Sequence, residues 1–256
     1  MNVVDISSRD NPLVKELQRL AQDNQAYRKQ RRVWLEGDHL CRAFLQRGGR
    51  PQLAVFTEDS WPALRGTYGA AAARNVVLKP ALMRAISGLE SPAPLAFVAE
   101  WQPAAGLQAG LATVVLDRLQ DAGNVGAILR SAGAFGFGQV AALTGTAALW
   151  SPKVLRAGMG AHFGLRLVEG LAPADLPALQ LPLLVTSSHG GQYLHQGGLP
   201  FPCAWVLGHE GQGVQPELEQ MAALKVRIAQ PGGEESLNVA VAAGICLHAS
   251  AAGALG

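Results

Sequence analysis

Three short segments combine glycines with side chains that could bind or position a substrate, and each follows an apolar run. The first contains Asn124 and Arg130, the second contains Glu210 between glycines, and the third contains Ser236 and Asn238. Amide, hydroxyl and carboxylate groups form hydrogen bonds to a ligand, and a guanidinium stabilises developing negative charge. Because ligands of parallel α/β sheets bind outside the carboxyl ends of the strands, the three segments predict one composite ligand site.

The first segment raises a geometric problem. Asn124 follows Gly123 and can cap a helix that starts at Val125. Arg130 lies six residues further along, which corresponds to about 600° of helical rotation and leaves about 240° between the two side chains. A single site would therefore need either a cap that turns Asn124 back or a second subunit. A capping asparagine beside a surface arginine explains the same residues without any ligand.

The other segments also allow simpler interpretations. His209 has a pKa suited to a general base, but a side chain between a strand end and a glycine turn can also point to solvent. Ser236 or Asn238 can cap the helix that follows, and capping alone would explain both. A dinucleotide site is disfavoured because Gly123-x-x-Gly126 lacks the GxGxxG spacing, and no acidic residue ends a second strand about 20 residues later.

The elements that must position these residues alternate between strand and helix patterns. The run 111–116 is continuously apolar, as expected for a strand buried on both faces of a parallel sheet. The other expected strands are 53–57, 75–78, 95–100, 139–143, 182–186, 204–207 and 225–228; the expected helices are 12–20, 39–46 with Asp38 as its cap, from 81, 125–135, 152–157, 216–223 and from 238 onward. This alternation predicts an α/β fold with a mostly parallel sheet.

A change of pattern divides the chain. The stretch 101–110 contains Pro103, Gly106 and Gly110 and is the best candidate for a linker. We therefore expect two domains, residues 1–105 and 106–256. The first carries 14 Lys and Arg against 10 Asp and Glu, a net charge of +4, and the second carries 7 against 9, a net charge of −2.

The positive charge of the first domain is clustered. Arg28, Lys29, Arg31 and Arg32 form a short basic run. Clustered cations are typical of proteins that contact phosphate groups, so the run predicts an RNA-binding surface. A solvated helix face explains the same run without a partner.

Composition excludes several other classes. The chain has 256 residues, of which 49% are hydrophobic and 16% charged, enough to fill a sizeable core. Cys41, Cys203 and Cys246 lack metal-ligand spacing and do not cluster with histidines, so we expect neither a metal site nor a disulfide framework. The beginning of the sequence lacks the apolar region of a secretory signal, and the apolar stretch 239–255 contains His248 and Ser250. We expect a cytoplasmic protein in which this stretch is a buried helix or a subunit contact, without a membrane partner.

Taken together, the three segments resemble the motifs of the SpoU (TrmH-like) branch of the SPOUT RNA methyltransferases, over residues 111–252. The matching positions are Asn124, Gly126 and Arg130 in the first motif, Gly208, Glu210, Gly211 and Gly213 in the second, and Ser236, Leu237, Asn238 and Val239 in the third. The segment 34–57 resembles, more loosely, a small domain similar to ribosomal protein L30e that precedes the catalytic domain in many members.

The resemblance implies a fold and an assembly. It implies a C-terminal SPOUT domain with a parallel sheet and a trefoil knot, preceded by the small L30e-like α/β domain. It also implies a homodimer with the active site at the interface, where Arg130 could serve the partner's site. S-adenosylmethionine would be the cofactor; the residues implied to bind it are Thr186, Leu207, Gly208, Ile228, Leu237 and Asn238.

The implied activity is methyl transfer to a ribose 2′-hydroxyl of a structured RNA, with ribosomal RNA favoured over tRNA. The implied catalytic residues are Arg130, Asn124, Glu210, Ser236 and Asn238. Because a guanidinium is normally charged, Arg130 is better suited to stabilise the developing alkoxide than to act as a base. The sulfonium leaving group carries its own positive charge, so no metal is required.

The sequence departs from the family pattern in three loops, one of which has Gly158 where the family often carries a serine. Asp121-Ala122-Gly123 replaces the usual Asp-Pro, and Ile228-Ala229-Gln230 replaces the usual Ile-Pro-Met, which could change how the adenine end of the cofactor is held. Alternative functions are a tRNA 2′-O-methyltransferase, a non-catalytic RNA-binding protein on the same scaffold, and methylation of a base or a protein.

Overall fold

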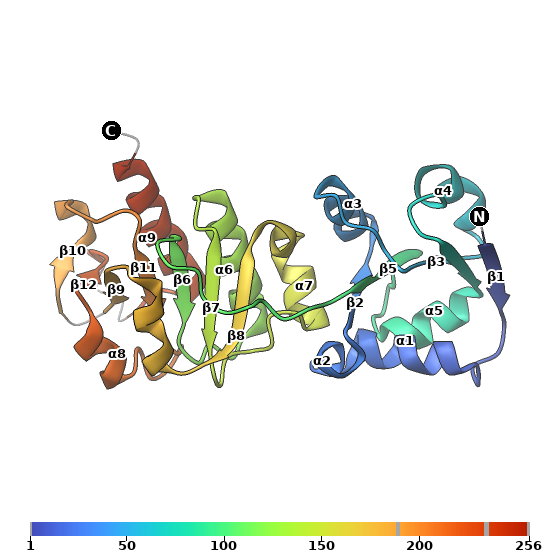
Figure 1. The fold of residues 1–256 in the computed structure, drawn as a ribbon, viewed down its shortest axis with the longest axis horizontal. Coiled ribbons are helices and arrows are strands. Elements are labelled where there is room, and N and C mark those ends of the chain that lie inside the picture. Colours follow the sequence, from blue (N-terminus) through green and yellow to red (C-terminus); the bar gives the residue numbers. More distant parts are fainter. Residues whose placement is uncertain (1, 188–189, 233–235, 255–256) are drawn as a thin grey trace. The chain divides into compact units, whose positions relative to one another are not determined.

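The computed structural model describes residues 2–187, 190–232 and 236–254. The chain divides into two compact units, one of residues 1–102 with 150–163 and the other of residues 103–149 with 164–256 (Figure 1). The segment 150–163, which contains α7 (Pro152–Gly158) and all but the last residue of η1 (Ala161–Gly164), groups with the first unit, contrary to a simple division at a linker. The functional domain limits 1–105 and 106–256 stay a prediction.

The first unit is built on a five-stranded mixed sheet in the order β1-β4-β3-β5-β2. The strands β1 (Asn2–Ile6), β4 (Arg74–Leu78) and β3 (Leu53–Thr57) are parallel to one another. The strand β5 (Leu95–Glu100) runs antiparallel to both β3 and β2 (Arg32–Glu36). The resulting unit is a small α/β domain, as expected; its likeness to L30e stays a prediction.

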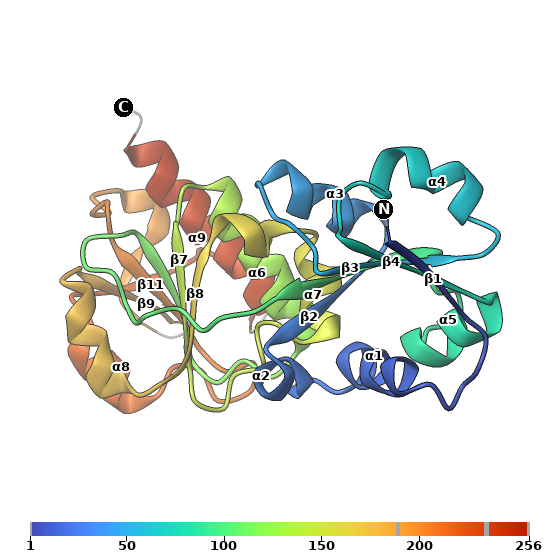
Figure 2. The ribbon, with the colours of Figure 1, turned by 45° about the vertical axis from the view of Figure 1, so that its right-hand side comes forward.

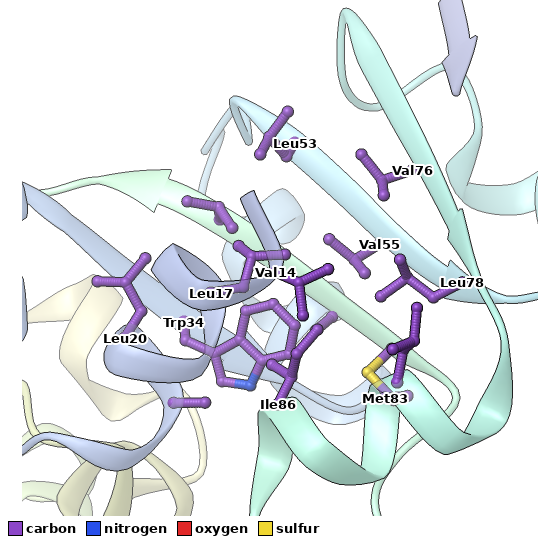
Figure 3. Close-up of a cluster of buried hydrophobic side chains, with 14 of the residues drawn as sticks. Val14, Leu17, Leu20, Trp34, Leu53, Val55, Val76, Leu78, Met83 and Ile86 are labelled. Carbon is purple, nitrogen blue, oxygen red and sulfur yellow. The ribbon is translucent and has the colours of Figure 1, made fainter. Parts of the chain in front are cut away.

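Helices cover both faces of this sheet. In Figure 2, α1 (Pro12–Gln22) and α5 (Pro80–Ser87) lie on one face, and α3 (Asp38–Gln46) and α4 (Trp61–Tyr68) lie on the other. The short helix α2 (Ala26–Gln30) carries part of the basic run. Side chains alternate across each strand, so Val55 packs with Leu17, Trp34 and Ile86 in the core under α1 and α5 (Figure 3).

The start of α3 differs from expectation. The residue before the helix is Gly37, with a φ of 97°, and Asp38 is the first helical residue and not the cap. A positive φ favours glycine, which explains the glycine at the entry to the helix. The carboxylate of Asp38 instead pairs with Arg42, at 2.5 Å, and accepts a hydrogen bond from the hydroxyl of Tyr68.

The second unit is built on a seven-stranded sheet in the order β10-β12-β9-β11-β6-β7-β8, and all its registered pairs are parallel. This confirms the expected α/β fold with a parallel sheet. The strands are β6 (Thr113–Leu116), β7 (Gln139–Leu143), β8 (Arg166–Leu171), β9 (Leu183–Thr186), β10 (Gln192–Tyr193), β11 (Ala204–Leu207) and β12 (Leu224–Arg227).

Two long helices pack together on this sheet. Helix α9 (Val239–Gly253) lies against α6 (Ala122–Ala134) and β11 (Figure 1), and Trp205 Nε1 of β11 donates a buried hydrogen bond of 2.8 Å to Ser250 Oγ of α9. A second core packs under α8 (Pro216–Met221) and η2 (Pro173–Leu179), and a further short turn, η3 (Leu194–Gln196), follows β10.

Helix α9 is less buried than the sequence predicted. Val241 keeps 52% of its surface exposed and Ile245 keeps 38%, so one apolar face of the helix is uncovered within this chain. Of the two expectations for this stretch, complete burial is wrong, and a subunit contact stays open. Leu255, the end of the stretch, lies outside the described residues. None of the helices in the described ranges has the length and apolar character needed to cross a membrane.

Candidate functional site

The site lies at the carboxyl ends of β6 and β11, two neighbouring strands in the middle of the sheet. From β6 the chain moves outward to β7 and β8 on one side, whereas β9, β11 and β12 fill the other side. The register pairs Leu207 with Leu116, so the loops after the two strands begin side by side. Such a reversal of strand order leaves a crevice for a ligand in open α/β sheets.

The carboxylate of Glu210 faces the beginning of α6. It accepts hydrogen bonds from the backbone nitrogens of Gln120 and Asp121, both at 3.4 Å, and from Asn124 Nδ2 at 3.3 Å. Partial burial works to raise the pKa of Glu210, but its own backbone amide, the Asn124 side chain and the amides of Asp121 and Gln120 outweigh this effect. The pKa of Glu210 is therefore lowered, and the carboxylate is charged at neutral pH.

The start of α6 differs from the sequence prediction. The cap is Asp121, whose Oδ1 accepts a 2.7 Å hydrogen bond from the Asn124 backbone nitrogen, and the helix begins at Ala122. Asn124 therefore lies inside the first helical turn, and its side chain is free to bond to Glu210. The sequence left two ways to bring Asn124 and Arg130 into one site: a helix cap that turns Asn124 back, or a second subunit. The first is excluded, because the cap is Asp121 and not Asn124.

Asn238 joins the same network from the last helix. Its Oδ1 caps α9 by accepting from the backbone nitrogens of Ala240, at 2.8 Å, and Val241, at 3.3 Å. Its Nδ2 donates to Asn124 Oδ1 at 2.9 Å. One side chain thus closes the helix and extends the chain of bonds from Glu210 through Asn124. Capping is confirmed for Asn238, but capping alone does not account for it.

Two of the expected catalytic residues stand apart from this network. Ser236 is exposed and does not cap α9, and no hydrogen bond joins its side chain to another described residue. Arg130 is exposed on α6, and its guanidinium has no hydrogen bond or ion pair with any part of the chain that is described. The fold therefore brings together Asn124, Glu210 and Asn238.

The glycines of the second motif have a steric reason. A Cβ atom on Gly208 would lie 2.3 Å from the backbone nitrogen of Val214, so only glycine lets the turn fold back on the strand end. His209 and Gly213 close the turn with two backbone hydrogen bonds, of 2.9 and 3.1 Å. The His209 ring stabilises the turn as well, because Nδ1 accepts from the backbone nitrogens of Gly211 and Gln212, at 3.0 and 3.2 Å.

The expected cofactor residues lie along the same edge of the sheet. Thr186 ends β9, Leu207 ends β11 and is followed by Gly208, and Ile228 follows β12; the three strands are adjacent. The Thr186 hydroxyl is occupied, since it donates to the carbonyl of Val206 at 3.1 Å. These positions offer mainly backbone hydrogen-bonding groups and apolar side chains. Such groups fit an adenine ring and its sugar.

Two further observations bear on that fit. Gln230, in the loop that departs from the family pattern, has a buried Oε1 with no hydrogen-bond partner among the described residues. Leu237, between the third motif's serine and asparagine, keeps 37% of its surface exposed. The residues present are therefore compatible with the cofactor.

Four polar residues of the site were missed from the sequence. Asp117 and Arg118 follow β6, and Gln212 and Gln215 belong to the turn after β11; all four are linked by hydrogen bonds. A signal was available for Asp117, because a carboxylate directly after a run of four buried strand residues must find partners. The glutamines carry no such signal.

The basic run of the first unit is only partly available to a ligand. Arg28, Lys29 and Arg31 are exposed, and the Arg31 guanidinium lies 5.6 Å from the centre of the Trp101 ring. Arg32 is half-buried and forms an ion pair with Glu16, which neutralises it.

Comparisons with known proteins agree with the motifs and the fold. The sequence model of the SpoU rRNA Methylase family matches residues 112–248. An uncharacterized tRNA/rRNA methyltransferase of Synechocystis sp. is 30% identical, over 96% of this chain and 93% of its own length. The 23S rRNA (guanosine(2553)-2′-O)-methyltransferase RlmP of Bacillus subtilis is 29% identical, over 84% of this chain and 86% of its own.

Among solved structures, an RNA 2′-O ribose methyltransferase superimposes with a TM-score of 0.80, at 28% identity, over 98% of this chain and 100% of its own. An AdoMet-bound rRNA methyltransferase from Sinorhizobium meliloti has a TM-score of 0.83 at 24% identity, over 97% of each chain, and shows the shared fold. With its first two motifs at the carboxyl ends of β6 and β11, its third at the start of α9, and the family match over more than half its length, the chain belongs to the SpoU rRNA methylase family.

Proposed function

We propose that this protein transfers a methyl group from S-adenosylmethionine to a ribose 2′-hydroxyl of a structured RNA, with ribosomal RNA as the favoured substrate. The observation that carries the proposal is the chain of hydrogen bonds from Glu210 through Asn124 to Asn238 at the strand ends. Family membership and the printed activities of the relatives support the same conclusion.

S-adenosylmethionine would be held by Thr186, Leu207, Gly208, Ile228, Leu237 and Asn238. When bound, the cofactor supplies a methyl group activated by a sulfonium. The residues of the chain orient the acceptor: Glu210 is charged and fixes the amide of Asn124, and Asn238 fixes the same amide from the other side. A fixed amide can hydrogen-bond to a ribose hydroxyl without reorganising, which favours the transition state.

Arg130 would stabilise the developing alkoxide in the active site of a second copy of the chain. Arg130 is rotated by about 240° from Asn124 around α6, so the two side chains do not lie on the same face of the helix. The Arg130 guanidinium has no described partner in its own chain. Val241 and Ile245 of α9, and Leu237 just before its cap, are spaced four residues apart and are exposed, and α9 packs beside α6. An apolar stripe next to an unpartnered arginine is what a symmetric subunit contact would cover.

The basic residues Arg28, Lys29 and Arg31 would contact RNA phosphates, whereas the ion pair of Arg32 with Glu16 reduces the contribution of Arg32 to RNA binding.

A trefoil knot is proposed as well. The chain must return from β12, on one side of β9 and β11, to reach α9, and part of this return lies outside the described residues. Action in the cytoplasm stays a prediction.

Two measurements test the proposal. The first is transfer of a tritiated methyl group to total RNA from a strain that lacks the protein, followed by nuclease mapping for a 2′-O-methyl nucleotide. Label in ribosomal RNA is expected; label in tRNA would change the substrate, and label on a base or a protein would change the reaction. Tight RNA binding without any transfer would leave a non-catalytic RNA-binding protein.

The second measurement separates chemistry from binding. Arg130→Ala should abolish transfer while calorimetry with S-adenosylhomocysteine gives an unchanged affinity. Arg84→Ala, at another exposed helical arginine, is the matched control and should keep both. Sedimentation of a Val241→Asp variant should show a monomer that has lost activity, and an active monomer would contradict the proposed dimer.

A further inference from the structure

The carboxylate of Asp117 is completely buried directly behind the catalytic turn. It is 0% exposed and accepts four hydrogen bonds, two from Arg118 and two from Gln215. Three of these are short: 2.7 Å from Arg118 Nε, 2.8 Å from the Gln215 backbone nitrogen and 3.0 Å from Gln215 Nε2. A buried carboxylate is stable only with such partners, so Asp117 fixes Gln215 firmly to the end of β6.

Arg118 adopts a backbone conformation that arginine seldom takes. Its φ is 58°, in the left-handed region, where a non-glycine residue is destabilised by about 1 kcal/mol. This conformation lets the guanidinium fold back onto the preceding side chain, Asp117, through Nε at 2.7 Å and Nη2 at 3.2 Å. The third nitrogen, Nη1, donates to Gln212 Oε1 at 3.1 Å. One side chain thus connects the loop after β6 with the turn after β11.

The turn after β11 is closed on itself by hydrogen bonds. Its base is closed by the paired backbone bonds of His209 and Gly213, and its tip carries Glu210. The three bonds that Glu210 makes to the start of α6 measure 3.3 to 3.4 Å, at the weak end of the range. Three shorter bonds join the loop after β6 to the turn: Asp117 accepts from the backbone nitrogen and Nε2 of Gln215, at 2.8 and 3.0 Å, and Arg118 Nη1 donates to Gln212 Oε1 at 3.1 Å. They therefore hold the position of the turn more strongly than the Glu210 bonds do.

We propose that Arg118, anchored by Asp117, is a positioning residue of the methyl-transfer site: it holds the Glu210 turn through Gln212 so that Glu210 reaches Asn124. This inference rests on the proposed function. Arginine is needed because a lysine ammonium cannot bind both carboxylate oxygens and still reach Gln212 with a rigid third donor. Arg118 itself need not touch the RNA or the cofactor.

The test is a double-mutant cycle. Gln212→Ala removes only the link to the turn and leaves Asp117 paired, and Arg118→Gly removes the guanidinium while relieving the positive φ. If Arg118 acts through Glu210, Arg118→Gly should lower kcat by about tenfold or more and change the KM for RNA by less than about twofold. Gln212→Ala should show a smaller loss of the same kind. In a Glu210→Gln background, neither change should lower kcat further.

A matched control isolates the backbone effect. Gln180, with a φ of 53°, is another left-handed residue of the same unit, and Gln180→Gly should leave kcat unchanged. Full additivity with Glu210→Gln, or an unchanged kcat in both Arg118→Gly and Gln212→Ala, would overturn the proposal. A loss caused only by unfolding would also overturn it: the urea midpoint would fall in step with activity, and Gln212→Ala, which keeps the buried pair, would be fully active.

Hydrogen exchange keeps this inference separate from the proposed function. Amides of Gly211, Gln212 and Gly213 should exchange faster in Arg118→Gly and Gln212→Ala than in the wild type or Gln180→Gly. If the wild-type protein transfers no methyl group, the proposed function fails, and the exchange result still decides whether Arg118 holds the turn. Unchanged exchange in both variants would refute the positioning role itself.

Discussion

Asn238 performs two tasks that different substitutions can separate. Its Oδ1 caps α9, and its Nδ2 holds Asn124 at 2.9 Å. Alanine removes both contacts, whereas serine keeps a hydroxyl that can cap the helix but cannot reach Asn124 as a donor. Serine and asparagine are about equal as caps, and alanine is worse by about 1 kcal/mol.

The magnitudes follow from these contacts. Asn238→Ala loses both the cap and the bond to Asn124 and should lower the free energy of unfolding by about 2 kcal/mol, whereas Asn238→Ser loses only the bond and should lower it by about 1 kcal/mol. The bond to Asn124 contributes about 1 kcal/mol net, so both variants should lower kcat by about fivefold if that bond is fully used in the transition state. Urea unfolding measures the first quantity, and methyl transfer to the identified RNA measures the second.

A cap elsewhere provides the control. Asn11 caps α1 with its Oδ1, which accepts from the Leu13 backbone nitrogen at 2.9 Å. Asn11→Ala should lower stability by about 1 kcal/mol and leave kcat unchanged. Full activity in Asn238→Ser, or a loss of kcat that simply follows stability across the three variants, would refute the separate role of the Asn124 contact.

Three further outcomes are expected. Gly208→Ala should abolish binding of S-adenosylhomocysteine in calorimetry, because the new Cβ would lie 2.3 Å from the Val214 backbone nitrogen; retained affinity would contradict this role for Gly208. Hydrogen bonds lower the pKa of Glu210 below its usual 4.5. The stability that the charged carboxylate contributes is therefore present above pH 4.5 and is lost as the pH falls through the lowered pKa of the folded state. In urea titrations below pH 4.5, the wild type should lose stability relative to Glu210→Gln. Burial raises the pKa of Cys203 to about 11 and that of Cys246 to about 12, and it also raises the pKa of Cys41. A thiol reagent at about pH 8 should therefore label none of the three before urea unfolds the chain. Rapid labelling of the native protein would show that the thiols are accessible.

The strands that could be predicted from the sequence are mainly interior ones. Continuous apolar runs marked β6 and β11, which are flanked on both sides by other strands. The strands without an expected counterpart, β1, β2, β8 and β10, all lie at the edges of the two sheets. An edge strand meets solvent along one side and tolerates mixed composition, so its pattern is weaker. β1, for example, exposes most of its residues.

The site could be predicted in its members but not in its connections. Glycine spacing and polar residue types identified Glu210, Asn124 and Asn238 from the sequence. The cap of α6 was misplaced because Asp121 and Asn124 are both good capping residues three positions apart, and sequence alone gives no basis for choosing between them. Asp117 and Arg118 were missed because their partners come from a distant loop.

The bond between Asn124 and Asn238 joins residues that are 114 positions apart in the chain. A contact of such long range requires a large loop to close before it can contribute, which costs conformational entropy. The ordering of Asn124 therefore depends on the docking of α9, and a chain that has formed its strands but not placed this helix would lack half of the network. Catalytic competence is in this way tied to the docking of the C-terminal helix, so a molecule in which α9 is not docked would lack the contact that orders Asn124.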